Sequence, residues 1–333
     1  MKIQHYLFTL IVATLFLFSC QKENRALFIP TNHLAEFSNE ESQFVDLDMI
    51  EYKKIIGKHG TVIFYDRDLF ELKETEKVQL ELIELYDYNE ILYRNIQTLT
   101  TDNKLLETSG VLKIVFTSNG KELKLKKGEK LIIYPPKGKL RDNDIFLSEN
   151  DSLGNIKWEL TDQNYVYVQQ DLGGGITKST TIHRDSLDDF RKKQQEYWRN
   201  QELEIEYQNK LNRNYFILTK NNYQWINIDK LALIKDKINV NFKCNNNKIG
   251  GFNIYLVYEK LDAFIVYQRN ALHLNFEKLP ICGKTHLIFI GGNDDTKVVY
   301  YDKIELNQSL SNTELNLDLK KISKEKLKNL FKK

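Results

Sequence analysis

Residues 78–85 read VQLELIEL, and this stretch indicates most directly how the chain folds. Val78, Leu80 and Leu82 alternate with Gln79 and Glu81. A two-residue period of this kind is typical of a strand that buries one face and exposes the other. Comparable alternation recurs along the chain, at residues 112–116, 122–126, 131–134, 156–160 and 238–242. Many short strands with polar turns between them predict a mainly β protein made of sandwiches.

Turn residues separate these strands. Ser118-Asn119-Gly120 is a typical turn sequence. Pro135-Pro136 should end the strand before it, because proline has no N–H to donate to a ladder. Further strands are predicted at residues 215–218, 225–229, 253–258, 263–267, 286–290 and 297–301. We therefore predict two β-sandwich domains, at residues 46–170 and 213–320, the second of immunoglobulin-like size.

Composition excludes several classes of protein. The 333 residues carry 48 Lys+Arg against 46 Asp+Glu, for a formal net charge of +2. This balance gives no reason to expect a nucleic-acid partner, which requires a concentrated basic face. With 41% hydrophobic residues, including 18 Tyr and 18 Phe, the chain has enough apolar area for a core. Three cysteines are too few for a disulfide framework.

The N-terminus contains an apolar run of twelve residues, Leu7–Phe18. A transmembrane helix needs about 20 apolar residues, whereas a shorter run fits the apolar region of a signal peptide. We therefore predict a cleaved signal peptide at residues 1–19.

The end of this run, Leu17-Phe18-Ser19-Cys20, resembles a bacterial lipobox. The resemblance implies cleavage between Ser19 and Cys20 and acylation of Cys20, which would anchor the protein to a membrane. The alternative is an ordinary secretory signal with an incidental cysteine. Lys22-Glu23 resembles the surface-export signal of Bacteroidota lipoproteins, which implies display outside the outer membrane; a periplasm-facing protein is the alternative. Residues 20–45 are predicted to be a tether.

Several segments, in their order along the chain, resemble a family of Bacteroidota lipoproteins whose first domain is similar to the ZU5 β-sandwich. They are His59–Ile63, Leu69-Phe70, Val78–Asp87, Leu105–Val111, Asn119–Leu123 and Gly128–Pro135. Trp225-Ile226-Asn227-Ile228-Asp229 resembles the segment that opens the second domain of the same family. The resemblance implies an interaction module without an active site.

Two segments are predicted to be helical. A break at Gly173-Gly174-Gly175 precedes a charged stretch, with Ser186 as the N-cap of a helix at about 187–209. We interpret residues 171–212 as a linker, with a partner-binding arm as the alternative. Ser323 should cap a short basic helix within residues 321–333, solvated or in contact with anionic headgroups.

Few residues suggest chemistry. The six histidines lack the spacing of a zinc site, and Asp66/Asp68 and Asp294/Asp295 are interpreted as turn residues rather than calcium ligands. We predict no catalytic residue, metal or cofactor. Cys244 and Cys282 are a candidate disulfide or two ordinary thiols. Ser152 and Ser186 lie in Asp-Ser-Leu tripeptides that resemble Bacteroidota O-glycosylation sites.

These observations favour an envelope-anchored, non-enzymatic lipoprotein that binds a protein or glycan at the cell surface. A structural spacer in an adhesion or motility machine is one alternative. A carbohydrate-active hydrolase with an unrecognised carboxylate pair is another, because such pairs sit about 5–10 Å apart in space and leave no mark in one sequence.

Overall fold

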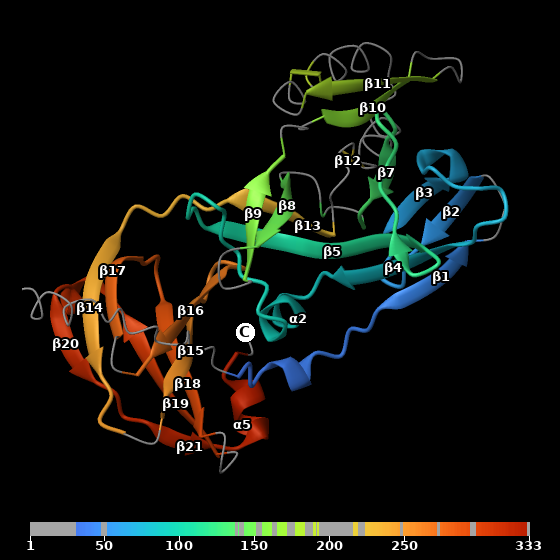
Figure 1. Cartoon of the computed structure of the whole chain (residues 1–333). Helices are drawn as coiled ribbons and strands as arrows, with labels where there is room; N and C mark the ends of the chain where they lie inside the picture. Colours follow the sequence, from blue (N-terminus) through green and yellow to red (C-terminus); the bar gives the residue numbers. More distant parts are fainter. Residues whose placement is uncertain are drawn as a thin grey trace, which may run out of the picture.

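The computed structural model describes the chain from Thr31 to Phe331 with gaps. The described residues are 31–47, 52–136, 139, 143–150, 155–161, 165–171, 177–183, 189–190, 192, 216–218, 224–246, 249–271, 274–293 and 298–331. They are mainly β and form antiparallel sheets arranged as two sandwiches, which confirms the predicted fold class (Figure 1). The predicted signal peptide, the cleavage site at Ser19 and Cys20, and the serines Ser152 and Ser186 lie outside the described residues.

The first sandwich packs a seven-stranded sheet on a six-stranded one. The larger sheet has the order β1 (Gln43–Leu47), β4 (Val78–Leu85), β5 (Leu106–Ser118), β13 (Trp225–Leu231), β8 (Asp144–Asn150) and β9 (Ile156–Leu160), with β6 (Lys121–Glu122) beside β5. The smaller sheet has the order β11 (Thr177–His183), β10 (Tyr165–Asp171), β12 (Phe216–Leu218), β7 (Leu131–Tyr134), β3 (Val62–Asp66) and β2 (Tyr52–Ile56).

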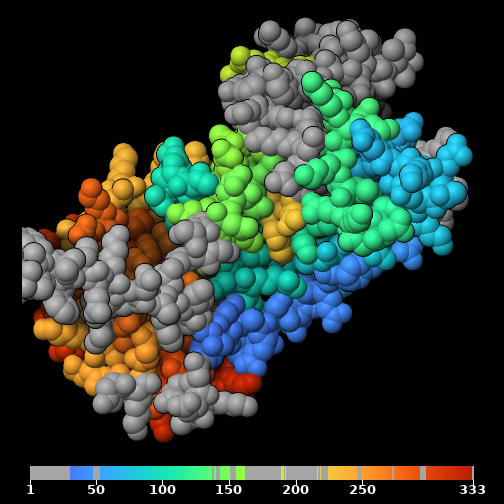
Figure 2. Space-filling model, in the orientation of Figure 1, coloured from blue at the N-terminus to red at the C-terminus, as the bar shows by residue number. Residues whose placement is uncertain are grey.

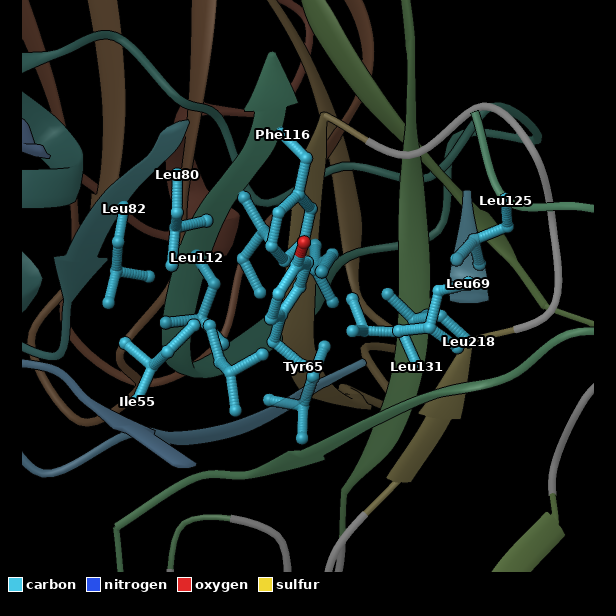
Figure 3. Packing of buried hydrophobic residues seen from close by; sticks show 14 of the residues in the cluster. Ile55, Tyr65, Leu69, Leu80, Leu82, Leu112, Phe116, Leu125, Leu131 and Leu218 are labelled. Atoms are coloured by element: carbon cyan, nitrogen blue, oxygen red, sulfur yellow. The ribbon is translucent and has the colours of Figure 1, made fainter. Parts of the chain in front are cut away.

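Alternating apolar residues of both sheets meet in the core of this sandwich. Leu80 and Leu82 of β4, Leu112 of β5 and Leu131 of β7 belong to this core, and each is 0% exposed (Figure 3). The stacked rings of Tyr65 and Phe116, with centroids 5.8 Å apart, fill the centre. The alternation that predicts the β4 strand therefore also defines its buried face.

The second sandwich is smaller. One sheet has the order β17 (Leu274–Pro280), β14 (Lys237–Lys243) and β20 (Thr313–Asn316); the other has the order β16 (Phe264–Asn270), β15 (Gly251–Tyr258), β18 (Thr285–Asn293), β19 (Val298–Leu306) and β21 (Lys320–Ile322). β14 and β20 pair in parallel, whereas the other ladders of the described residues are antiparallel. Phe242, Phe276 and Phe289 pack edge-on in its core.

The predicted start of the second sandwich at residue 213 is wrong. β12 pairs with β7 and β10, and β13 pairs with β5 and β8, so both strands complete the first sandwich. Ile226 and Ile228 are buried in the first core. Alternation identifies a strand and its buried face but does not specify its neighbours. The sequence alone therefore does not show which sandwich β12 and β13 join.

Three further boundaries need correction. Residues 177–183 were assigned to the linker but form β11, which pairs with β10. Residues 31–45 were assigned to the tether but include Leu34, which is 0% exposed, and most of β1. Residues 123–126 do not continue β6, and only a single bridge joins Leu125 to Phe70. Of the helix predicted at 187–209, the structure describes only residues 189, 190 and 192, which are helical.

The helices are short and lie at the ends of strands. Those whose bounds the described residues define are η1 (Ala35–Phe37), η2 (Arg67–Leu69), α2 (Tyr88–Tyr93), η4 (Gln308–Leu310) and α5 (Lys324–Asn329). The Ser323 hydroxyl accepts a hydrogen bond from the Lys326 N–H, which confirms the predicted N-cap of α5. No described helix is long and apolar enough to cross a membrane.

Candidate functional site at the junction between the sandwiches

A third cluster of buried apolar residues joins the two sandwiches, and we call it the junction. It draws on β4, β5, β8, β9 and α2 of the first sandwich and on β15, β16, β18 and α5 of the second. Its fully or nearly fully buried members are Leu34, Ile83, Leu85, Ile91, Leu92, Tyr93, Ile96, Leu106, Val111, Phe146, Trp158, Tyr255, Val257, Phe264, Ile288, Ile290, Leu327 and Phe331. Apolar burial on this scale favours one fixed arrangement of the two domains.

The N-terminal arm, residues 31–42, contacts both sandwiches at the junction. Asn32 Nδ2 donates to the Tyr93 carbonyl of α2 at 3.0 Å, and Asn253 Nδ2 of β15 donates to the Thr31 carbonyl at 2.8 Å. Lys324 Nζ of α5 forms an ion pair with Glu36 at 2.5 Å. The arm thus contacts both sandwiches and the C-terminal helix.

The loop between α2 and β5 hydrogen-bonds to the second sandwich. Thr98 donates to the Phe264 carbonyl from its N–H (3.1 Å) and its hydroxyl (2.8 Å), and that hydroxyl accepts from the Phe264 N–H at 2.8 Å. In β5, which follows this loop, the Thr108 N–H donates to the Asp262 carbonyl at 2.8 Å. Trp158 Nε1 of β9 also holds this loop, because it donates a hydrogen bond to the Gln97 carbonyl at 2.7 Å.

A buried polar pair lies on the junction face of the first sandwich. Asn227 and Asp229 of β13 are each 0% exposed, and Asn227 Nδ2 donates to Asp229 Oδ2 at 2.5 Å. Burial raises the pKa of Asp229 to about 7, although the nearby donors of Thr108, Asn227 and Ser109 act to lower it. Asp229 Oδ1 makes no hydrogen bond with any described residue. Charge on this carboxyl group is therefore unfavourable in the folded protein.

This pair is part of the segment Trp225–Asp229, which was expected to open the second domain. In the sheet, Asn227 pairs with Val111 of β5 on one side and with Phe146 of β8 on the other, and both of these are junction residues. A bulge in the pairing with β5 follows between Ile228 and Asp229. The two polar side chains therefore lie on the face opposite the first core. Sequence alternation marks this strand, but does not indicate that its second face is also buried.

A second buried carboxylate, Glu84, holds together the end of the first sandwich. It is 1% exposed and accepts hydrogen bonds from the His59 N–H, the Thr61 N–H and Gln43 Nε2, each at 2.9 Å. Gly57 leaves room for it, because a Cβ atom there would lie 2.4 Å from Glu84 Oε2. The carboxylate links β4 and β1 of one sheet to the β2–β3 turn of the other.

Replacing Glu84 by Gln is expected to lower the free energy of unfolding by about 2–3 kcal/mol, because an amide nitrogen would face a buried N–H that needs an acceptor. Urea unfolding measures the change. Glu81→Gln on the same strand is the matched control: Glu81 pairs with Lys113 at 2.9 Å but is partly exposed, so its loss should cost less than about 1 kcal/mol. Equal costs for the two substitutions would contradict the assigned role of Glu84.

The structure does not bring the other described candidate residues together into one site. Cys244 is half-buried after β14, Cys282 is exposed before β18, and both are free cysteines, so the candidate disulfide is not formed. Asp66 accepts from the Asp68 N–H at the start of η2, which agrees with its interpretation as a turn residue. His59 contacts Glu40, and His286 contacts Glu259. The described residues contain no group of three or more side chains suited to a metal ion.

The structure also changes the interpretation of the C-terminal helix. The helix was predicted to be solvated or in contact with anionic headgroups, but one side of it is buried in the protein. Leu327 is 1% exposed, Phe331, just after α5, is 3% exposed, and both pack in the junction. The ring of Phe331 lies edge-on to Tyr255 of β15 at 5.3 Å. The Leu327–Phe331 spacing of four residues is the available signal for a buried helix face.

Comparisons with protein-family models, curated proteins and solved structures found no match for this chain. The geometry of the junction is therefore the main guide to function.

Proposed function

We propose that this chain is an envelope-anchored lipoprotein that acts as a non-catalytic interaction module at the cell surface and binds a protein or glycan. The junction carries the proposal. Its apolar cluster and the N-terminal arm hold two sandwiches in one arrangement, so binding surfaces on either sandwich keep a constant relative position. The lipobox-like sequence at Cys20 and the resemblance to ZU5-like lipoproteins support the anchor and the class of module.

A structural spacer within an adhesion or motility machine is the second candidate. The same junction favours it, because a spacer must transmit force without bending between its domains. The carbohydrate-active hydrolase stays an alternative, and assays for turnover on envelope glycans would detect it.

The partner can be identified by crosslinking the protein in the native envelope and recovering it with its neighbours. Specific recovery of one surface protein or glycan supports the interaction module. Recovery of several subunits of one assembly favours the spacer, and the absence of any reproducible partner would contradict both. Protease treatment of intact cells tests surface display, and complete protection would contradict it.

Anchoring is tested by replacing Cys20 with Ala. The variant is expected to move from the membrane fraction to the soluble fraction after a high-salt wash, because it lacks the acyl chains. Cys282→Ala is the matched control: it removes an exposed free thiol elsewhere and should leave the protein on the membrane. Retention of the Cys20→Ala protein on salt-washed membranes would refute the anchor.

A further inference from the structure

Basic residues gather where the N-terminal arm meets the C-terminal helix. We define the α5 face as Lys321 of β21 together with Lys324, Lys326 and Lys328 of α5. Lys321, Lys324 and Lys326 are exposed, whereas Lys328 is half-buried with its Nζ 5.9 Å from the centre of the Phe37 ring. Figure 2 shows the arm in blue and α5 in red beside one another on the surface.

Burial of Leu327 and of Phe331, which follows α5, in the junction fixes the rotation of the helix. Lys324 and Lys326 stay exposed on either flank of these buried residues. The ion pair between Lys324 and Glu36 holds the first turn of the helix on the arm, and Ser323 caps that turn.

The charge on this face is neutralised only in part. Glu36 pairs with Lys324, and Glu325 is the only acidic residue within α5. Lys321 and Lys326 have no carboxylate partner among the described residues. In the sequence, two more lysines follow at positions 332 and 333. An excess of exposed lysines on a short helix suits a surface that carries many phosphate groups.

The chain enters the folded protein at the same place. The Thr31 carbonyl accepts a hydrogen bond from Asn253 in the junction, and ten residues, 21–30, separate Thr31 from the proposed anchor at Cys20. Even a fully extended chain spans only about 3.3–3.6 Å per residue, so Cys20 lies within about 40 Å of Thr31. An acylated Cys20 therefore keeps the membrane within reach of the α5 face, which contacts the same arm through Lys324 and Glu36.

We propose that the α5 face docks on anionic lipid headgroups of the membrane that holds the anchor. The proposal rests on the proposed function, because it is the anchor that brings the membrane within reach. Docking orients the molecule, with the junction against the headgroups and the remote ends of both sandwiches facing away. Those ends are then the parts that meet a partner.

The test uses the mature chain, residues 20–333, with Cys20→Ala, so that no acyl chain contributes to binding. The protein is sedimented with vesicles of phosphatidylglycerol and phosphatidylcholine, or of phosphatidylcholine alone, at low salt. We expect binding only to the anionic vesicles. One lysine near an anionic surface changes the affinity about fivefold, so Lys321→Gln with Lys326→Gln should weaken binding roughly 25-fold.

The matched control is Lys121→Gln with Lys127→Gln, which removes the same charge from exposed positions at the far end of β5. It should leave vesicle binding unchanged. Equal losses in the two variants, equal binding to neutral vesicles, or no binding to anionic vesicles would each overturn docking by the α5 face. None of these results bears on the anchor, which fails only if the Cys20→Ala protein stays on salt-washed membranes.

Discussion

Replacing Trp158 by Ala is expected to lower the free energy of unfolding by about 4 kcal/mol. Trp158 is 0% exposed, so the substitution leaves a large cavity in the junction. It also removes the indole donor of the Gln97 carbonyl at 2.7 Å, which leaves a buried acceptor unpaired. Thermal and urea unfolding measure the change.

The substitution should also loosen the coupling between the sandwiches. The loop that Trp158 supports carries Thr98, whose N–H and hydroxyl bond to Phe264 of the second sandwich. We expect the wild type to unfold in one transition and the Trp158→Ala variant in two, because each sandwich of the variant retains its own core. Differential scanning calorimetry resolves this.

Two control variants define the role of Trp158. Trp158→Phe keeps an aromatic ring but loses the indole donor, and should cost about 1–3 kcal/mol. Leu233→Ala removes an apolar side chain that is 91% exposed, and should change stability by less than about 0.5 kcal/mol. A cost for Trp158→Ala no greater than that for Leu233→Ala would contradict the structural role of the tryptophan.

Ionisation of Asp229 is expected to destabilise the folded protein by about 4 kcal/mol as pH rises. Its pKa is raised from 3.8 to about 7 in the folded chain, so the folded state holds the proton more tightly than the unfolded state. The contribution of this group to stability is therefore complete below about pH 4 and is lost as the pH rises to about 7. The cause is burial of the carboxyl group at a position where Oδ1 has no partner among the described residues.

Asp229→Asn keeps the shape of the side chain and removes the charge. The free energy of unfolding of the variant minus that of the wild type should increase by about 4 kcal/mol between pH 4 and pH 8, because only the wild type loses stability as Asp229 ionises. Asp236→Asn is the control, because it makes the same change at an exposed position of the chain between β13 and β14. Urea unfolding at several pH values measures both differences. A difference between wild type and Asp229→Asn that does not vary with pH would show that this carboxyl group does not titrate in the expected range.

Much of the local structure was predictable. The alternation from Val78 to Leu82 predicts both the strand β4 and its buried face. Asn119 and Gly120 adopt φ angles of 51° and 73°, the left-handed conformation that these residue types favour in a hairpin turn. Ser323 caps α5 as predicted. In each case the deciding interaction lies within a few residues along the chain, so a short window of sequence contains it.

The candidate site was largely not predictable. Residues 156–160 and 225–229 were predicted to be strands, but the faces that carry Trp158 and Asn227 are buried only because the junction covers them. The contact between Thr98 and Phe264 spans 166 positions, and that between Thr31 and Asn253 spans 222. Alternation reports which residues share a face but carries no information about which distant strand or domain will lie against it.

The sequence by itself therefore determined the β class, many of the strands, the Asn119-Gly120 turn and the cap of the last helix, because these depend on local periodicity and hydrogen bonding. Only the tertiary structure assigned β12 and β13 to the first sandwich, placed the N-terminal arm and α5 in the junction, and buried Asp229. These features depend on apolar surfaces meeting across long separations in the chain, and the gain from that burial becomes apparent only when both surfaces are in place.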